Sequence, residues 1–146
     1  MNPAERAYAQ YRKSLSNGDI GHSFRTHLQA CLQYPDDGFS PFHPFLEFGI
    51  YSKQVERYLA CFSPEQIRLS LYEDVTRGYE GWFAQTLAFL GVDTTFTPKW
   101  HRDQTSEQTR ATEMSAQERE LLVNYYMDDI LELEELIGRR LGAWLR

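Results

Sequence analysis

The sequence predicts a mainly α-helical chain that contains one β-strand. Apolar residues recur every three or four positions in five separate segments, which is the spacing of one face of a helix. Residues 67–72 instead alternate apolar and polar, which is the period of a strand. Aromatic residues make up 14% of the 146 residues, enough to form a buried core, so we predict one folded domain spanning 1–146.

The first two helices are predicted from their ends. Asn2 suits a helix cap, Pro3 suits the first helical position, and Glu5 is placed to complete a capping box. Gly18 follows the last apolar residue of this helix and is expected to end it, because glycine accepts the left-handed conformation. Ser23 is the expected cap of the second helix.

Three more helices are expected further along the chain. The apolar spacing predicts them at 48–62, at 79–90 with Gly91 closing the helix, and from Ser115 to about Gly138. The stretch PDDGFSPFHPF is too rich in proline for regular structure, and the polar residues 93–114 are expected to form a long loop.

The predicted strand at 67–72 is the element that does not fit a complete fold. A strand leaves its backbone N–H and C=O groups unpaired unless a second strand lies beside it. The chain offers no second segment with strand periodicity. Either residues 67–72 are not a strand, or the neighbouring strands belong to sequence outside this chain.

Charge and composition narrow the classes of function. The formal net charge is −6 and the pI is near 5.2, which argues against general nucleic-acid binding. No apolar run approaches the roughly 20 residues of a membrane span, and no signal peptide is recognisable. Cys31 and Cys61 are expected to be buried thiols in a reducing compartment, so we expect a cytoplasmic protein without a membrane partner. The histidines show no metal-ligand spacing.

Four segments resemble one enzyme family. NPAERAYAQY is similar to the segment R-[DN]-P-x-x-R-x-x-S-x-Y of sulfotransferases that use 3′-phosphoadenosine 5′-phosphosulfate, particularly the heparan-sulfate type and its bacterial relatives. GIYSKQVERYLACFSPEQIRLSLYEDV resembles that family's central helix and following strand. AFLGVD and LLVNYYMDDILELEELIGRRLGAWL resemble two later helices. Together the matches cover nearly the whole chain in the family's order.

The resemblance implies an α/β, P-loop-like fold of which this chain is the C-terminal half. The implied chemistry is transfer of a sulfuryl group from 3′-phosphoadenosine 5′-phosphosulfate to a hydroxyl or amine of a small-molecule or glycan acceptor, mainly by positioning and charge stabilisation. The family's phosphate loop precedes the first matched segment. Met1 and Ala9 stand where the family has the Arg and Ser that hold the 3′-phosphate, so we expect this chain alone to bind the cofactor weakly and to be inactive.

The resemblance also suggests site residues. Arg110 is the predicted cofactor contact, with Lys99 and Arg102 as weaker candidates. Tyr51 and Lys53 are predicted substrate-binding residues, although Tyr51 is equally compatible with a place in the core and Lys53 with a solvated surface. No catalytic residue and no metal ligand is predicted.

A second interpretation assigns a different class of function. Apolar faces that a missing sheet leaves exposed favour association. The alternative to a truncated sulfotransferase is therefore a non-catalytic helical interaction module derived from that fold, which associates with itself or is completed by another polypeptide.

Overall fold

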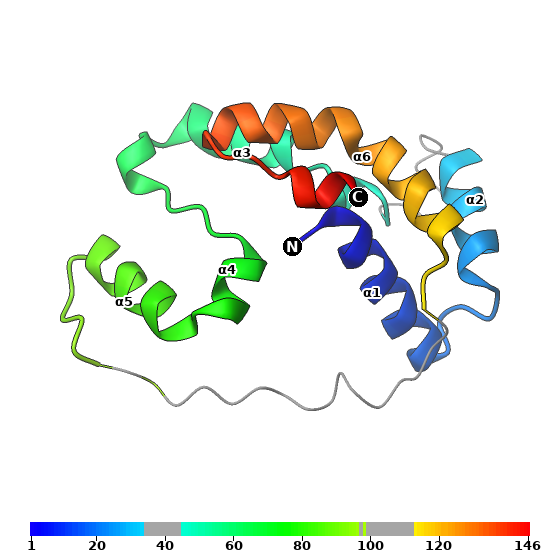
Figure 1. The fold of residues 1–146 in the computed structure, drawn as a ribbon, viewed down its shortest axis with the longest axis horizontal. Coiled ribbons are helices and arrows are strands. Elements are labelled where there is room, and N and C mark those ends of the chain that lie inside the picture. Colours follow the sequence, from blue (N-terminus) through cyan, green and yellow to red (C-terminus); the bar gives the residue numbers. More distant parts are fainter. Residues whose placement is uncertain (34–44, 97, 99–112) are drawn as a thin grey trace. The chain divides into compact units, whose positions relative to one another are not determined.

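The computed structural model describes residues 1–33, 45–96, 98 and 113–146. Figure 1 shows that the described part of the chain consists of helices joined by short connections. The elements are α1 (Pro3–Asn17), α2 (Phe24–Gln33), η1 (Glu47–Gly49), α3 (Tyr51–Cys61), η2 (Pro64–Gln66), α4 (Tyr72–Arg77), α5 (Tyr79–Phe89), α6 (Ala116–Ile137) and η4 (Gly142–Leu145).

The chain divides into two compact units. The larger unit comprises residues 2–57 and 109–146, and the smaller unit comprises residues 58–108 with Met1. Because this division groups residues by contact, the expectation of a single folding domain over 1–146 stays a prediction. Among the described residues, no helix is both long and apolar enough to traverse a lipid bilayer.

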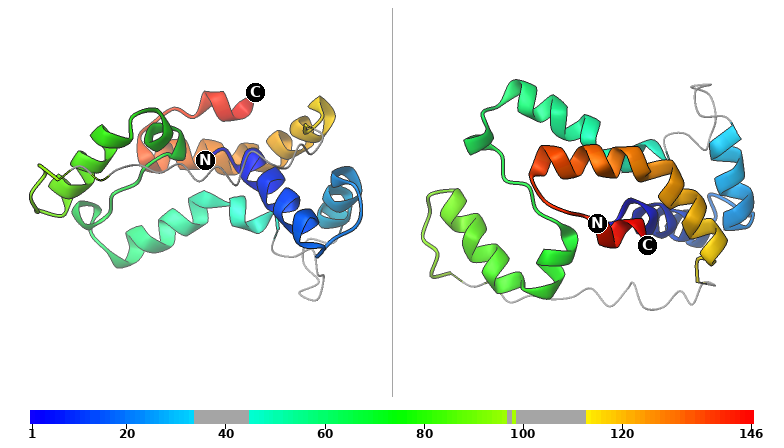
Figure 2. Two further views of the ribbon diagram at one scale, coloured as in Figure 1. Left: turned by 90° about the horizontal axis from the view of Figure 1, so that it is seen from below. Right: turned by 45° about the horizontal axis from the view of Figure 1, so that its top comes forward.

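The larger unit has a well-defined core. Helix α6 runs alongside the first residues of α3, and α1 crosses near it, as the views in Figures 1 and 2 agree. Tyr126 and Ile130 of α6 and Leu28 of α2 are at most 1% exposed. The other buried hydrophobic residues are Ala4, Ala7, Tyr11, Phe24, Cys31, Phe45, Leu46, Leu122, Val123, Leu133, Leu141 and Trp144.

The helix ends agree with the sequence prediction at most positions. Gly18 ends α1 at φ 80° and Gly138 ends α6 at φ 62°, both in the left-handed region where glycine avoids a Cβ clash. The Ser23 hydroxyl accepts a bond from the N–H of Thr26 in the first turn of α2. The predicted capping box of α1 is wrong in one respect, since Asn2 caps the helix while Glu5 pairs with Arg119 instead.

The predicted strand at 67–72 is corrected by the structure. Residues 67–71 have extended backbone, with φ −116° and ψ 122° at Ile67 and φ −82° and ψ 138° at Leu71. No ladder hydrogen bond joins them to another described segment, so they are not a strand. Tyr72 already belongs to α4, a short helix that the sequence analysis did not anticipate.

The smaller unit has no core of its own. None of its described residues from Tyr58 to Phe96 is buried, although α5 (YEGWFAQTLAF) is rich in apolar side chains. Cys61 is exposed, which corrects the expectation of two buried thiols, whereas Cys31 is buried as predicted.

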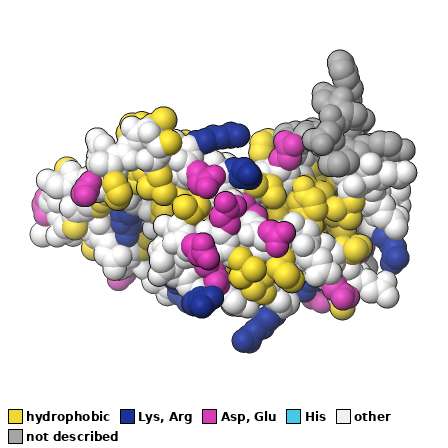
Figure 3. Space-filling model, turned by 90° about the horizontal axis from the view of Figure 1, so that it is seen from above, with side chains coloured by type: hydrophobic (Ala, Val, Ile, Leu, Met, Phe, Trp, Pro, Cys, Tyr) yellow, Lys and Arg dark blue, Asp and Glu magenta, His cyan; other side chains and the backbone are white. Residues whose placement is uncertain are grey.

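Acidic side chains lie beside hydrophobic ones on the face drawn in Figure 3. The acidic residues of α6 differ in their exposure to solvent. Asp128, Glu132 and Glu135 are exposed, as expected for a solvated face. Asp129 and Glu134 are each only 7% exposed, because the helix turns them toward the larger unit's interior. The sequence pattern of Asp128, Asp129, Glu132, Glu134 and Glu135 predicts a solvated helix face. That prediction is wrong for Asp129 and Glu134.

Candidate functional site

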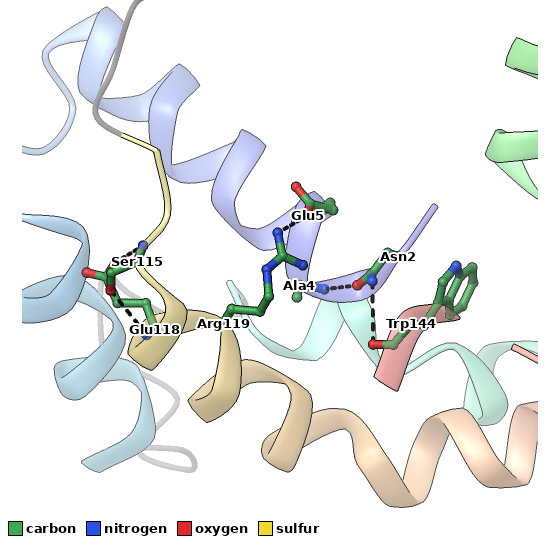
Figure 4. Close-up of polar contacts among 7 residues, drawn as sticks. All are labelled: Asn2, Ala4, Glu5, Ser115, Glu118, Arg119 and Trp144. Carbon is green, nitrogen blue, oxygen red and sulfur yellow. Dashed lines mark hydrogen bonds and ion pairs between the residues drawn. The ribbon is translucent and has the colours of Figure 1, made fainter. Parts of the chain in front are cut away.

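Parts of three of the segments that resemble the family meet at one place in the larger unit, where the first turns of α1 and α3 approach the middle of α6 and the C-terminal η4. Figure 4 shows the α1 side of this junction. Asn2 accepts a hydrogen bond from the N–H of Ala4 at 2.9 Å, and its amide donates to the carbonyl of Trp144 at 3.5 Å. The side chain of Asn2 thus links the beginning of α1 to the end of the chain.

The first turn of α6 is also attached to α1. Ser115 and Glu118 form a capping box at the start of α6, and Arg119, one residue further, pairs with Glu5 of α1 (Figure 4). Both partners of this ion pair keep about a third or more of their side chains exposed, at 34% for Arg119 and 45% for Glu5. Solvent therefore screens this ion pair. The pair orients α1 and α6 more than it stabilises their contact.

Asp129 of α6 caps the N-terminus of α3. Its carboxylate accepts the backbone N–H of Tyr51 at 2.9 Å and that of Ser52 at 3.0 Å, and the Ser52 hydroxyl lies 2.5 Å from Oδ1. Ser52 is fully buried, and its hydroxyl also lies 2.8 Å from Glu132 Oε2. A carboxylate at this position satisfies helix N–H groups and complements the positive end of the helix dipole. The N-terminus of α3 is consequently already occupied by an anion from the chain itself.

Tyr51, one of the predicted substrate-binding residues, lies in this junction. Its ring packs edge-on against Trp144 with a centroid separation of 6.2 Å, and the residue is partly exposed. The Asp129 cap and the Trp144 contact together hold Tyr51 at the edge of the core. Lys53 is exposed, and no contact among the described residues brings it into the junction. Arg110, Lys99 and Arg102 lie outside the described residues.

Arg6, the second arginine position of the first matched segment, is used inside the fold. Its guanidinium donates to the carbonyl of Phe45 at 2.5 Å and to Gln10 at 2.6 Å, and it lies 3.4 Å from the hydroxyl of Tyr126. Burial raises the pKa of Tyr126, so its phenol stays protonated and donates to the carbonyl of Leu46 at 2.8 Å. Arg6 and Tyr126 thereby fix the backbone of residues 45–46 rather than present a free cation.

Two departures from the family segment fall at positions that the resemblance assigns to phosphate recognition. Ala9 is exposed on α1 and provides no hydroxyl at the position of the family's Ser. Met1 provides no guanidinium at the position of the family's first Arg. The described residues also contain no group of three side chains suited to a metal ion. The junction therefore positions Tyr51 but assembles no complete phosphate site from the residues that the structure describes.

Asp129 is the residue at this junction that the sequence analysis missed. The acidic pattern of α6 predicts a solvated position for it. A signal for its role was available, since Asp129 lies three residues after Tyr126 and one before Ile130, on the apolar face of α6. A single carboxylate on the buried face of a helix indicates a buried partner.

Comparison with known proteins agrees with the matched segments. Over 173 aligned residues, the whole chain is 28% identical to the bifunctional heparan sulfate N-deacetylase/N-sulfotransferase 1 of Xenopus laevis and 27% identical to that of Xenopus tropicalis. The chain spans only 20% of the length of these curated relatives. No family model matches the sequence.

A solved structure extends this similarity to the fold. The sulfotransferase from Alicyclobacillus acidocaldarius superposes on 99% of this chain with a TM-score of 0.83 and 32% sequence identity. The superposition covers 55% of the bacterial chain. The α/β sulfotransferase fold class predicted from the resemblance is therefore confirmed, and this chain spans a mainly helical part of that fold.

Proposed function

We propose that this chain, which belongs to a sulfotransferase family and spans part of the length of its relatives, is the portion of a sulfotransferase that helps to form the acceptor side of the active site. In its intact form the enzyme transfers a sulfuryl group from 3′-phosphoadenosine 5′-phosphosulfate to a hydroxyl or amine of a small-molecule or glycan acceptor. The observation that carries the proposal is the match of almost the entire chain, at 32% identity, to one solved sulfotransferase.

The junction around Tyr51 supports an acceptor-side role. Asp129 and Trp144 hold Tyr51 at the core's edge, where the residue is partly exposed. Lys53 lies two residues later on an exposed position, where a cation favours an anionic acceptor. Transfer itself needs phosphate-holding donors, and Met1 and Ala9 do not provide them. We therefore propose weak donor binding by the 146 residues alone, with Arg110 as the remaining cofactor contact.

The experiment is to compare the 146-residue chain with a longer protein that includes any adjoining coding sequence in the same reading frame. Sulfuryl transfer from radiolabelled 3′-phosphoadenosine 5′-phosphosulfate is measured on a panel of N-desulfated heparin, simple phenols and amines. Binding of adenosine 3′,5′-bisphosphate is measured by thermal shift. We expect transfer and a clear rise in melting temperature only for the longer protein. Absence of both from the longer protein would contradict the proposal.

A second candidate is the non-catalytic interaction module. The observation that favours it is the smaller unit, where no described residue between Tyr58 and Phe96 is buried. Under this interpretation the chain associates with itself or with a completing polypeptide and never binds the nucleotide. The same thermal-shift measurement separates the two, because nucleotide binding at any chain length contradicts a purely structural role.

A further inference from the structure

The chain reverses direction after α6, and one residue holds both ends of this reversal. Gly138 ends α6 in the left-handed conformation, at φ 62°. The backbone carbonyl of Glu134 accepts the N–H of Arg139 at 3.1 Å, and its carboxylate accepts the N–H of Leu141. Glu134 is only 7% exposed, so residues 138–141 are attached to the larger unit through a buried carboxylate.

The bond from Leu141 is the more important of the two that this carboxylate forms. The second partner is Arg140, whose guanidinium lies 3.0 Å from Oε2. The Arg140 side chain is 91% exposed, so solvent screens the ion pair. Leu141 is 3% exposed, and a buried N–H that loses its acceptor is costly. The N–H of Leu141, ahead of Arg140, also lowers the pKa of Glu134 against the opposite effect of burial.

Apolar packing contributes little on one side of the reversal. An open cavity of about 400 Å³ borders it, lined by Leu131, Glu134, Glu135, Gly138, Arg139 and Arg140. Leu131 is the one apolar side chain among these six described residues, so little hydrophobic contact fixes the backbone there. The polar contacts of Glu134 therefore hold this side of the reversal.

The position of Leu141 in turn determines that of Trp144. The carbonyl of Leu141 accepts the N–H of Trp144 at 2.7 Å, at the start of η4. Trp144 is 5% exposed, and its ring packs edge-on against Tyr51. Its carbonyl accepts the side-chain amide of Asn2 (Figure 4). A displacement of Leu141 would therefore move Trp144 away from Tyr51.

We propose that Glu134 is a positioning residue, which places Trp144 against Tyr51 by binding the backbone N–H of Leu141 and so shapes the acceptor side of the active site. Glu134 acts through the turn and η4, at the opposite end of this series of contacts from Tyr51. The acceptor-side role rests on the proposed function, whereas the placement of Trp144 does not.

A residue that only ended α6 would act differently. Gly138 and the backbone carbonyl of Glu134 already end the helix, and neither requires a carboxylate at position 134. Removing the carboxylate should therefore leave α6 folded and disturb only the residues that follow it. This difference separates positioning from general stabilisation.

The first test uses the full 146-residue chain. NMR measures amide hydrogen exchange at Leu141 and Trp144, and the ring-to-ring NOE between Tyr51 and Trp144. In Glu134→Ala we expect exchange about tenfold faster at both amides, the size of one lost charge-assisted hydrogen bond, and loss of the NOE. Glu134→Gln should restore both, because glutamine keeps an oxygen acceptor for the N–H. Exchange at Ile130, within α6, should not change.

Two control variants isolate the bond from Leu141. Glu135→Ala removes the same group from the adjacent, exposed position. Arg140→Ala removes only the ion pair. Each should change exchange at Leu141 less than about twofold, as expected for exposed side chains.

The placement of Trp144 is disproved if Glu134→Ala keeps the NOE, if Glu134→Gln fails to restore it, or if Arg140→Ala also loses it. It is likewise disproved if Glu134→Ala accelerates exchange at Ile130 as much as at Leu141, because the residue then stabilises the core in general.

The second test uses the longer protein in which sulfuryl transfer is measured. Glu134→Ala should raise KM for the acceptor about threefold or more and change KM for the donor less than about twofold, and Glu134→Gln should resemble the unchanged protein. An acceptor KM that stays constant, or that changes together with the donor KM, overturns the acceptor-side role. If the longer protein transfers no sulfuryl group, the proposed function fails and the acceptor-side role with it, whereas the NMR result still decides whether Glu134 places Trp144.

Discussion

Gly49 lies directly against the ring of Tyr126. A Cβ atom at Gly49 would come within 2.7 Å of the Cε1, Cζ and hydroxyl oxygen atoms of that ring. The ring has no room to withdraw, since Tyr126 is fully buried and its hydroxyl is bonded to the carbonyl of Leu46. The backbone of residues 46–49 therefore closes over Tyr126 only because position 49 has no side chain.

Replacing Gly49 with alanine should accordingly destabilise the protein. We expect a loss of about 1–3 kcal/mol in the free energy of unfolding, because overpacking displaces either the ring or the backbone. Urea denaturation followed by circular dichroism measures it. The control is Gly81→Ala, in the first turn of α5, where an added Cβ meets nothing within 4 Å. Gly81→Ala should be neutral or stabilising, since alanine is the better helix former. Equal losses for the two variants would refute the close contact.

Asp129→Ala should be among the most damaging single substitutions in α6. It removes the acceptor for two backbone N–H groups and the Ser52 hydroxyl, all close to the core. We expect a loss of about 2–4 kcal/mol in the free energy of unfolding, because buried donors lose their partner. Asp129→Asn should lose less, since it keeps one carbonyl oxygen as an acceptor.

Asp128 provides the matched control for this prediction. It is the adjacent residue of the same type, and it is exposed. Asp128→Ala should change the free energy of unfolding by less than about 0.5 kcal/mol. Thermal denaturation of the two alanine variants, side by side, is the measurement. Similar melting temperatures would show that Asp129 does not cap α3.

His27 should make the larger unit sensitive to acid. It is 5% exposed, its Nδ1 lies 3.2 Å from Nε2 of His22, and its ring packs against Tyr11 and Phe45. Burial, followed by the nearby His22, lowers the pKa of His27 from 6.5 to about 4. The folded state thus binds fewer protons than the unfolded state below pH 6.5. The contribution of neutral His27 to the free energy of unfolding is therefore full above pH 6.5 and declines as the pH falls toward 4.

The free energy of unfolding should decline by about 2 kcal/mol between pH 7 and pH 5 because of His27. Urea denaturation at both pH values, for the unchanged chain and for His27→Leu, measures it. The leucine variant should lose about 2 kcal/mol less than the unchanged chain over this range, because the carboxylates titrate in both proteins. Parallel pH dependence in the two proteins would rule out a neutral, buried His27.

The Glu5–Arg119 pair should contribute little to the free energy of unfolding. Although it joins α1 to α6, both side chains are substantially exposed. A double-mutant cycle with Glu5→Ala and Arg119→Ala should give a coupling energy of about 0.2–1 kcal/mol, decreasing as salt is added. A coupling well above 2 kcal/mol, insensitive to salt, would mean that the pair is shielded from water.

Several features of this protein are determined by the sequence alone. The caps at Asn2 and Ser23 and the stops at Gly18 and Gly138 depend on groups a few residues apart, so local chemistry is sufficient to place helix ends. The family resemblance was also readable, because its matched residues keep their order and spacing along the chain. The alternation at 67–72 correctly indicated extended backbone for residues 67–71, but the predicted strand is wrong, since these residues pair with no other described segment.

Tertiary structure alone decided which polar side chains are buried. Asp128 and Asp129 are identical in type and adjacent, yet one faces water and the other caps a helix that is 77 residues away in sequence. The guanidinium of Arg6 can bind either a phosphate or a carbonyl oxygen. The fold selects the carbonyl, because it brings the backbone oxygen of Phe45 within 2.5 Å of Arg6. The physical reason is that hydrogen-bond partners and desolvation depend on which distant segments meet in space. The spacing of residues along the sequence does not show which segments meet.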